Sequence, residues 1–106
     1  MEIMKAQRYL IKATYLEGPH EGETYFLRKD GHVTEADFPQ GFSDTYASKA
    51  SAARRCRKLE SDNTIDRNIE RREETHRIKK GKPPKEWYLY HLESYEPFEV
   101  EAIDFN

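Results

Sequence analysis

The stretch KASAARRCRKLESDNTIDRNIERREETHRIKKGKPPK, residues 49–85, decides how this 106-residue chain is organised. It holds thirteen of the eighteen Lys and Arg residues but only six of the twenty Asp and Glu residues, a local balance of +7. The formal charges of residues 1–48 sum to −3 and those of residues 86–106 to −6, so the net charge of the chain is −2. A basic middle therefore lies between two acidic ends.

The first part of this stretch has the pattern of a helix packed on a sheet. Ser48 is a suitable N-cap, because its hydroxyl can accept a hydrogen bond from an amide of the first turn. Ala52, Cys56 and Leu59 then recur at helical spacing and form a narrow apolar stripe. We expect this stripe to face the sheet.

The second part of the stretch does not continue this stripe. The residues Ser61-Asp62-Asn63 interrupt it, and the next apolar pair, Ile65 and Ile69, is out of phase. The pattern indicates either one long helix that bends or a second, strongly charged helix at about 65–80, and we adopt two helices. Gly81 is a natural C-cap, and the prolines that follow it prevent continuation.

The two ends of the chain carry strand patterns. Apolar alternation predicts strands at 8–16, 24–28 and 32–34, with a hairpin turn at Asp30-Gly31. Residues 87–93 have the strongest strand pattern, apolar on both faces, and 98–101 alternate again as a last edge strand.

These elements define an α+β fold. We predict an antiparallel sheet of three to five strands with one packed helix and a second charged helix, in the order ββ(β)ααβ(β). The length indicates a single domain over residues 1–106. Its parts are an N-terminal β-meander at 8–34, a basic helical segment at 48–80 and C-terminal aromatic and acidic strands at 86–106.

Composition restricts the class of protein. Leu, Ile, Val and Phe are scarce, and thirteen aromatic residues supply apolar area in their place. Cys56 is the only cysteine, which excludes an internal disulfide and fits a reducing compartment. No apolar run approaches the length of a membrane span or a signal sequence, so we expect a cytoplasmic protein with no membrane partner.

The basic segment is the first candidate site. Cations spaced along a helix can neutralise phosphates, but the same side chains can bind an acidic protein surface or remain solvated. The interspersed acids weaken a continuous phosphate-binding stripe. The candidate residues for binding a partner or nucleic acid are Arg54, Arg55, Arg57, Lys58, Arg71, Arg72, Arg77, Lys79 and Lys80.

The acidic and aromatic C-terminal part is the second candidate. Its tyrosines can anchor an interface or stack on bases, although forming the core is the simpler role. Its carboxylates can imitate a phosphate backbone, although protecting an edge strand or pairing with the basic helix is simpler. The candidate residues are Tyr88, Tyr90, Glu93, Glu96, Glu99 and Glu101.

Nothing in the sequence predicts catalysis. The four histidines lie far apart, and none has a His or Cys three or four residues away, as a helical metal site requires. Cys56 lies on the inward stripe of its helix and reads as a small apolar residue. We therefore expect no enzyme, no metal and no cofactor.

The chain resembles small accessory proteins of bacteriophages and prophages of Gram-positive bacteria. The similarity lies in the Lys29-Asp30-Gly31 hairpin turn, the Ala-rich helix start Tyr46-Ala47-Ser48 through Leu59, and a final aromatic strand. It covers roughly residues 8–60 and 86–94. Some proteins of this kind are anti-CRISPR proteins that inhibit Cas9 by binding the nuclease, its guide complex or its PAM-reading cleft. The resemblance assigns no functional residue.

Two functional hypotheses follow. The first is a phage-encoded binding protein that inhibits a host defence nuclease, Cas9 or its guide RNA complex. The second is a nucleic-acid-binding accessory or regulatory protein of a phage or mobile element, which uses the basic helix to contact DNA or RNA directly. A structural part of a phage is a third reading, and it would show as self-association.

Overall fold

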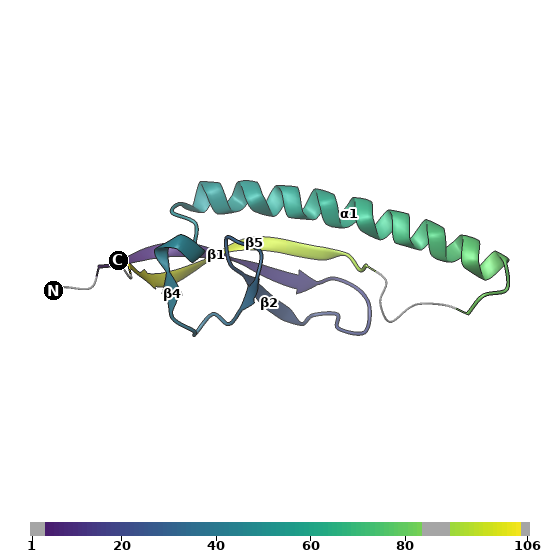
Figure 1. Cartoon of the computed structure of the whole chain (residues 1–106), viewed down its shortest axis with the longest axis horizontal. Coiled ribbons are helices and arrows are strands. Elements are labelled where there is room, and N and C mark those ends of the chain that lie inside the picture. The colour runs from purple at the N-terminus through teal and green to yellow at the C-terminus, as the bar shows by residue number, and fades with distance from the viewer. Residues whose placement is uncertain (1–3, 84–89, 105–106) are drawn as a thin grey trace.

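A long helix lies along one face of a five-stranded sheet in the computed structural model, which describes residues 4–83 and 90–104 (Figure 1). The strands follow the spatial order β3-β2-β1-β5-β4. The elements are β1 (Lys5–Tyr15), β2 (Thr24–Leu27), β3 (Val33–Thr34), β4 (Gln40–Gly41), the short 3₁₀ helix η1 (Phe42–Asp44), α1 (Lys49–Lys79) and β5 (Glu93–Ile103). The predicted α+β class is confirmed.

The centre of the sheet is an antiparallel pair formed by strands from the two ends of the described chain. β1 and β5 are each eleven residues long, and they pair without a bulge from Lys5↔Ile103 to Tyr15↔Glu93. Because side chains alternate along a strand, each strand presents one set of residues to the helix and the other to the opposite face.

The core on the helix side is small and mixed. Ile11, Tyr46, Ala52 and Cys56 are buried together, and Tyr9, Leu27, Leu59 and Tyr95 pack against them. The predicted inward stripe of the helix is therefore confirmed over its first three turns. Small residues at 52 and 56 let the helix approach the sheet closely, and the tyrosines of the strands fill the remaining space.

The opposite face of the sheet is covered at one end by the segment between β3 and α1. There Leu10, Val100 and Ala102 are buried. β4 pairs in parallel with β5, and Tyr46 then bridges Tyr9 on the β2 side of β1, so this segment passes from one side of the β1–β5 pair to the other. The sheet is therefore mixed, whereas the sequence predicted an antiparallel one.

Arg8 of β1 holds the crossing segment in place. Its guanidinium donates from Nε to Thr45 Oγ1 at 2.7 Å and from Nη2 to the carbonyl oxygens of Phe42 and Thr45 at 2.9 and 3.0 Å. It also lies 4.8 Å from the centroid of the Phe42 ring, within cation–π range.

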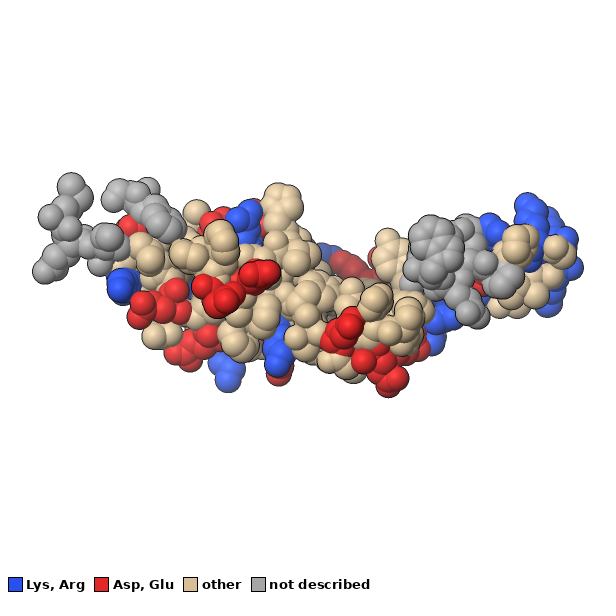
Figure 2. Space-filling view, turned by 90° about the horizontal axis from the view of Figure 1, so that it is seen from below, with Lys and Arg blue, Asp and Glu red and all other residues tan. Residues whose placement is uncertain are grey.

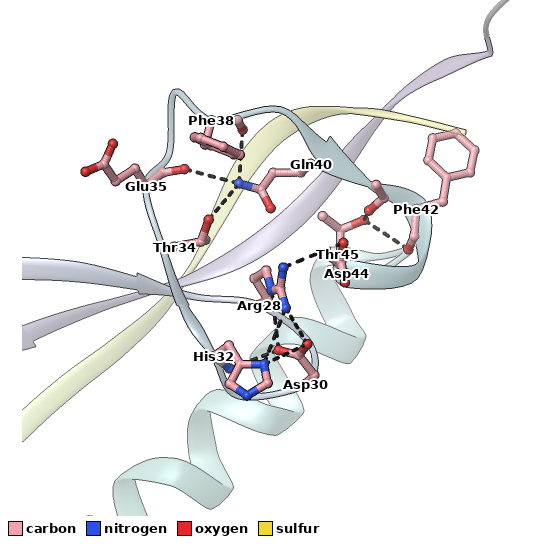
Figure 3. A network of polar contacts seen from close by, with 11 residues as sticks. Arg28, Asp30, His32, Thr34, Glu35, Phe38, Gln40, Phe42, Asp44 and Thr45 are labelled. Carbon is pink, nitrogen blue, oxygen red and sulfur yellow. Dashed lines mark hydrogen bonds and ion pairs between the residues drawn. The ribbon is translucent and has the colours of Figure 1, made fainter. Parts of the chain in front are cut away.

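A polar network joins the β2–β3 hairpin to the same segment (Figure 3). Arg28 forms ion pairs with Asp30 at 2.7 Å and Asp44 at 4.0 Å, and the Asp30 carboxylate accepts a hydrogen bond from the amide of His32. The Gln40 side chain is buried and donates to Thr34 Oγ1 and to two carbonyl oxygens of the loop.

The prediction of two helices is wrong, because α1 is one continuous helix from Lys49 to Lys79. Ser48 caps it as expected, accepting a hydrogen bond from the Ser51 amide at 3.1 Å. Ser61, Asp62 and Asn63 do not break the helix, since none of them prevents helical geometry as proline does. The apolar pattern changes there because the helix is attached by polar contacts beyond Leu59.

The predictions for the last strands are only partly correct: residues 98–101 do form a strand, but not at an edge, and residues 90–92 form none. Residues 84–89 lie outside the described part of the chain, Tyr90–Leu92 precede the strand, and β5 begins at Glu93 and lies in the middle of the sheet. Pro97 is tolerated there because it faces Ile11 in a pair that is not hydrogen-bonded, so its nitrogen points away from β1. On the other side of β5, β4 pairs only with Ala102 and Ile103, so no strand requires a hydrogen bond from the Pro97 nitrogen.

Gly18 and Gly22 provide a matched test of the β1–β2 turn. Both have φ near +87°, but a Cβ on Gly18 would lie 2.8 Å from the His91 ring, whereas nothing lies within 4 Å of one on Gly22. Gly22→Ala is expected to cost about 1–2 kcal/mol for the backbone conformation alone. Gly18→Ala is expected to cost at least about 1 kcal/mol more, because of the clash. Urea unfolding measures both, and equal losses would contradict the packing of His91 on this turn.

Candidate interaction surfaces

The carboxylate of Glu17, just after β1, holds the middle of the helix. It accepts hydrogen bonds from Arg67 Nε and Nη2 at 2.9 and 3.1 Å and from the amide of Leu92 at 3.0 Å. Arg71 Nη2 lies 3.7 Å away. The bond to Arg67 is the main cause that lowers the pKa of Glu17 to about 2.

Asn63 is the second attachment point, and its side chain bridges helix and sheet. It is only 7% exposed. Its Nδ2 donates to the carbonyl oxygen of His91 at 2.9 Å, while its Oδ1 accepts from the amide of Glu93 at 3.0 Å. One turn earlier, Glu60 accepts from the amide of Tyr95. Beyond Leu59 the inner face of α1 is therefore held to β5 by side-chain-to-backbone bonds.

These attachments use some of the predicted basic residues internally. Arg71 contacts Nδ1 of His91 at 3.2 Å, and Arg77 donates to the carbonyl oxygen of Pro83 at 3.0 Å and lies 3.8 Å from Glu74. Arg67 was missed by the sequence analysis, because its partner Glu17 is fifty residues away in the chain. No local pattern signals such a pair.

The other predicted basic residues lie on the exposed surface of the helix or just after it. These are Arg54, Arg55, Arg57, Lys58, Arg72, Lys79 and Lys80. Lys58 pairs with Asp62 at 3.2 Å, one turn further along, but both side chains are more than half exposed. Such a pair contributes only a few tenths of a kcal/mol, so Lys58 stays available to a partner.

Eight exposed positions share one side of α1, which we call the outer stripe. At 100° per residue they fall within a narrow arc turned away from Ala52, Cys56 and Asn63. Cations occupy its two ends, while Ile65 and Ile69 occupy its middle and are 54% and 46% exposed. The outer stripe consists of Arg54, Lys58, Ser61, Ile65, Ile69, Arg72, His76 and Lys79.

The predicted acidic row on the last strand does not form as one surface. Tyr88 lies outside the described residues, and Tyr90 is 53% exposed ahead of β5. Glu96 points to the face opposite the helix, whereas Glu99 and Glu101 belong to the other face, since their positions differ by an odd number. Lys12 lies 3.8 Å from Glu96, and Lys5 lies 3.8 Å from Glu101.

Glu93 has a different role from the other acids of β5. Its two carboxylate oxygens accept hydrogen bonds from the hydroxyls of Tyr25 at 2.6 Å and Tyr95 at 2.5 Å. Burial, followed by these bonds to the carboxylate, raises the pKa of both phenols, so both remain protonated donors. Tyr25, Tyr95 and one predicted acid, Glu93, are thus part of the internal structure.

Charge is polarised along the molecule (Figure 2). Acidic side chains are spread over the underside of the sheet, and Lys and Arg gather at the far end of the helix. The principal-axis extents of the molecule are 66 × 22 × 22 Å, so the basic end of the helix lies well away from the acidic surface of the sheet.

Cys56 is a buried free cysteine. Burial is the main cause that raises the pKa of the Cys56 thiol to about 11, which leaves it un-ionised near neutral pH. No group of three or more His, Cys, Asp and Glu side chains within residues 4–83 and 90–104 is placed to hold a metal ion. Over the same residues, no helix is both long and apolar enough to cross a membrane.

Glu17→Gln is expected to lower the free energy of unfolding by about 1–2 kcal/mol at neutral pH, because Arg67 loses its charged partner. A carboxyl group whose pKa is lower in the folded than in the unfolded state stabilises the fold at pH values above its unfolded-state pKa, which is about 4.5 for Glu17. The difference from the wild type is therefore expected to shrink as the pH falls from about 5 toward 2.

Chemical unfolding across this pH range measures the effect. Glu21→Gln, an exposed change in the same turn, is the control and is expected to change stability by less than about 0.5 kcal/mol. A Glu17→Gln loss that stays constant with pH would argue against the ion pair as the attachment.

Comparison with known proteins gives no relative: no family model matches the chain, and no curated protein or solved structure matches it either.

Proposed function

We propose that this chain is a non-catalytic binding protein that docks the outer stripe of α1 onto a protein partner. The observation that carries the proposal is the exposed pair Ile65 and Ile69, set between cations at both ends of the stripe. Isoleucine is a weaker helix former than Lys, Glu or Ala, so helix stability does not account for two adjacent exposed copies.

The charge pattern describes the partner. The stripe from Arg54 to Lys79 extends over about 38 Å of helix, long enough to lie in a groove on another protein. Its apolar middle suits an apolar groove, and its cationic ends suit acidic rims. A second copy of the chain fits poorly, because antiparallel pairing about the isoleucines would bring Lys58 opposite His76 and Arg54 close to Lys80.

The resemblance to phage accessory proteins supports a setting for this docking. In that setting the partner is a host defence nuclease, Cas9 or its guide complex, in the cytoplasm of a bacterial host. A cleavage assay with purified Cas9, guide RNA and target DNA tests this identity. Undiminished cleavage at a large molar excess of the chain would remove Cas9 as the partner and leave the docking surface to be tested on other proteins.

Direct binding of nucleic acid is the second candidate. It is favoured by the exposed cluster Arg54, Arg55, Arg57 and Lys58. Against it, about 21 Å of helix without a stripe cation separates Lys58 from Arg72, and two acids, Asp62 and Asp66, lie beside this interval. A surface that follows phosphates requires cations at regular intervals, and binding through it weakens steeply between about 50 and 200 mM salt.

The double variant Ile65→Gln, Ile69→Gln separates the two candidates. A protein-docking stripe is expected to lose about tenfold or more in affinity for its partner, or in inhibition of cleavage, because the apolar centre of the contact is removed. Stability is expected to change by less than about 0.5 kcal/mol, since both side chains are exposed. Binding to nucleic acid would be almost unchanged.

Ile78→Gln is the matched control, because Ile78 is also 54% exposed but lies about 140° around the helix from Ile65. The variant Arg54→Glu, Arg57→Glu, Lys58→Glu completes the set. Nucleic-acid binding would be the better assignment if the chain binds a DNA duplex or RNA strand in a salt-dependent way, and if the triple variant abolishes this binding while the isoleucine variant preserves it.

A further inference from the structure

A second surface, on the β2 side of the molecule and separate from the outer stripe, has the chemistry of a cation site. An open depression of about 750 Å³ is lined by Tyr15, Gly22, Glu23, Thr24, Tyr25 and Val33. The rings of Tyr15 and Tyr25 lie 5.4 Å apart at an interplanar angle of 41°, and the His20 ring lies 5.9 Å from Tyr15. Two aromatic rings in contact with each other thus border the depression.

Carboxylates surround these rings. Glu23 lines the depression and is mostly exposed, with one oxygen 2.6 Å from Nδ1 of His20. The carboxylate of Glu93 accepts a hydrogen bond from the Tyr25 hydroxyl. The pKa of Tyr15 is raised by burial and then by the charges of Glu93 and Glu23, so the negative potential of both acids reaches this ring.

Glu93 has no cationic partner among the described residues. Its carboxylate instead accepts hydrogen bonds from two neutral phenols, those of Tyr25 and Tyr95, which places the negative charge beside the Tyr25 ring. A phenol that donates to a carboxylate is also polarised toward a more electron-rich ring, which strengthens attraction of a cation to its face. Within residues 4–83 and 90–104, the cation stacked on an aromatic ring is Arg8 on Phe42, not one on either tyrosine.

The strand edge beside the depression is unpaired. β3 pairs with β2 only at Phe26 and Leu27, while Tyr25 and Leu27 face Ala13 and Ile11 of β1. Backbone N–H and C=O groups alternate in direction along a strand, so those of Thr24 point away from β1. No strand of the described chain pairs with them there. An edge of this kind can accept an extended peptide.

We propose that this depression binds an arginine side chain presented by an extended segment of a partner protein. The segment bonds to the backbone of Thr24, and its guanidinium stacks on the tyrosine rings and donates to Glu23. Arginine suits the site better than lysine, because a planar guanidinium stacks on an aromatic face and donates to a carboxylate at the same time. The site is independent of the outer stripe.

The test uses the full chain and two defined probes, N-acetyl-Val-Arg-Val-amide and the same peptide with citrulline, which is nearly isosteric with arginine but uncharged. Amide NMR spectra are recorded during titration to about 10 mM, since a single stacked cation gives affinities in the millimolar range. The expected result is that the arginine peptide shifts the amides of Gly22, Glu23, Thr24 and Tyr25, and that the citrulline peptide binds at least about fivefold more weakly.

Variants complete the test. Glu23→Gln, at an exposed position, is expected to weaken the arginine peptide about threefold or more, and Tyr15→Leu about fivefold. Glu101→Gln is the charge-matched control, and Ile65→Gln, Ile69→Gln leaves binding unchanged because the two sites are separate. Equal binding of both peptides, shifts confined to other residues, or no shifts at the highest concentration would overturn the proposal.

Discussion

The pairing of β1 with β5 is the constraint on which the rest of the structure depends. It joins Lys5–Tyr15 to Glu93–Ile103 over eleven residue pairs, and β2, β4 and α1 attach directly to these two strands, while β3 pairs with β2. β2 pairs with β1, β4 with β5, and α1 packs over both. Because the two strands are distant in sequence, their pairing closes a long loop, and the contacts of the pair and its neighbours must offset the entropy lost on that closure.

The helix is held to this pair by two different kinds of interaction. Its first turns bury Ala52 and Cys56 against Ile11 and Tyr46, so apolar contact stabilises them. Further along, the sheet offers backbone groups and a carboxylate, and the helix meets them with Asn63 and Arg67. Polar attachment of this kind is directional, since each donor needs its acceptor at a defined position.

This attachment divides the basic residues into two sets with separate roles. Arg67, Arg71 and Arg77 bond within the molecule, whereas the cations of the outer stripe face solvent on either side of Ile65 and Ile69. The same division holds for the acids, because Glu17 and Glu93 are hydrogen-bonded inside while Glu23 and Glu96 are exposed. Net charge alone does not describe either surface.

By itself the sequence determined the α+β class, the Ser48 cap, the inward stripe at Ala52, Cys56 and Leu59, and the hairpin at Asp30-Gly31, because each depends on residues within a few positions of one another. Only the tertiary structure decided that α1 is continuous, that β5 runs through Pro97 in the middle of the sheet, and which arginines are exposed. Those features depend on partners such as Glu17 and Arg67, which are fifty residues apart, and a local pattern carries no information about contacts at that separation.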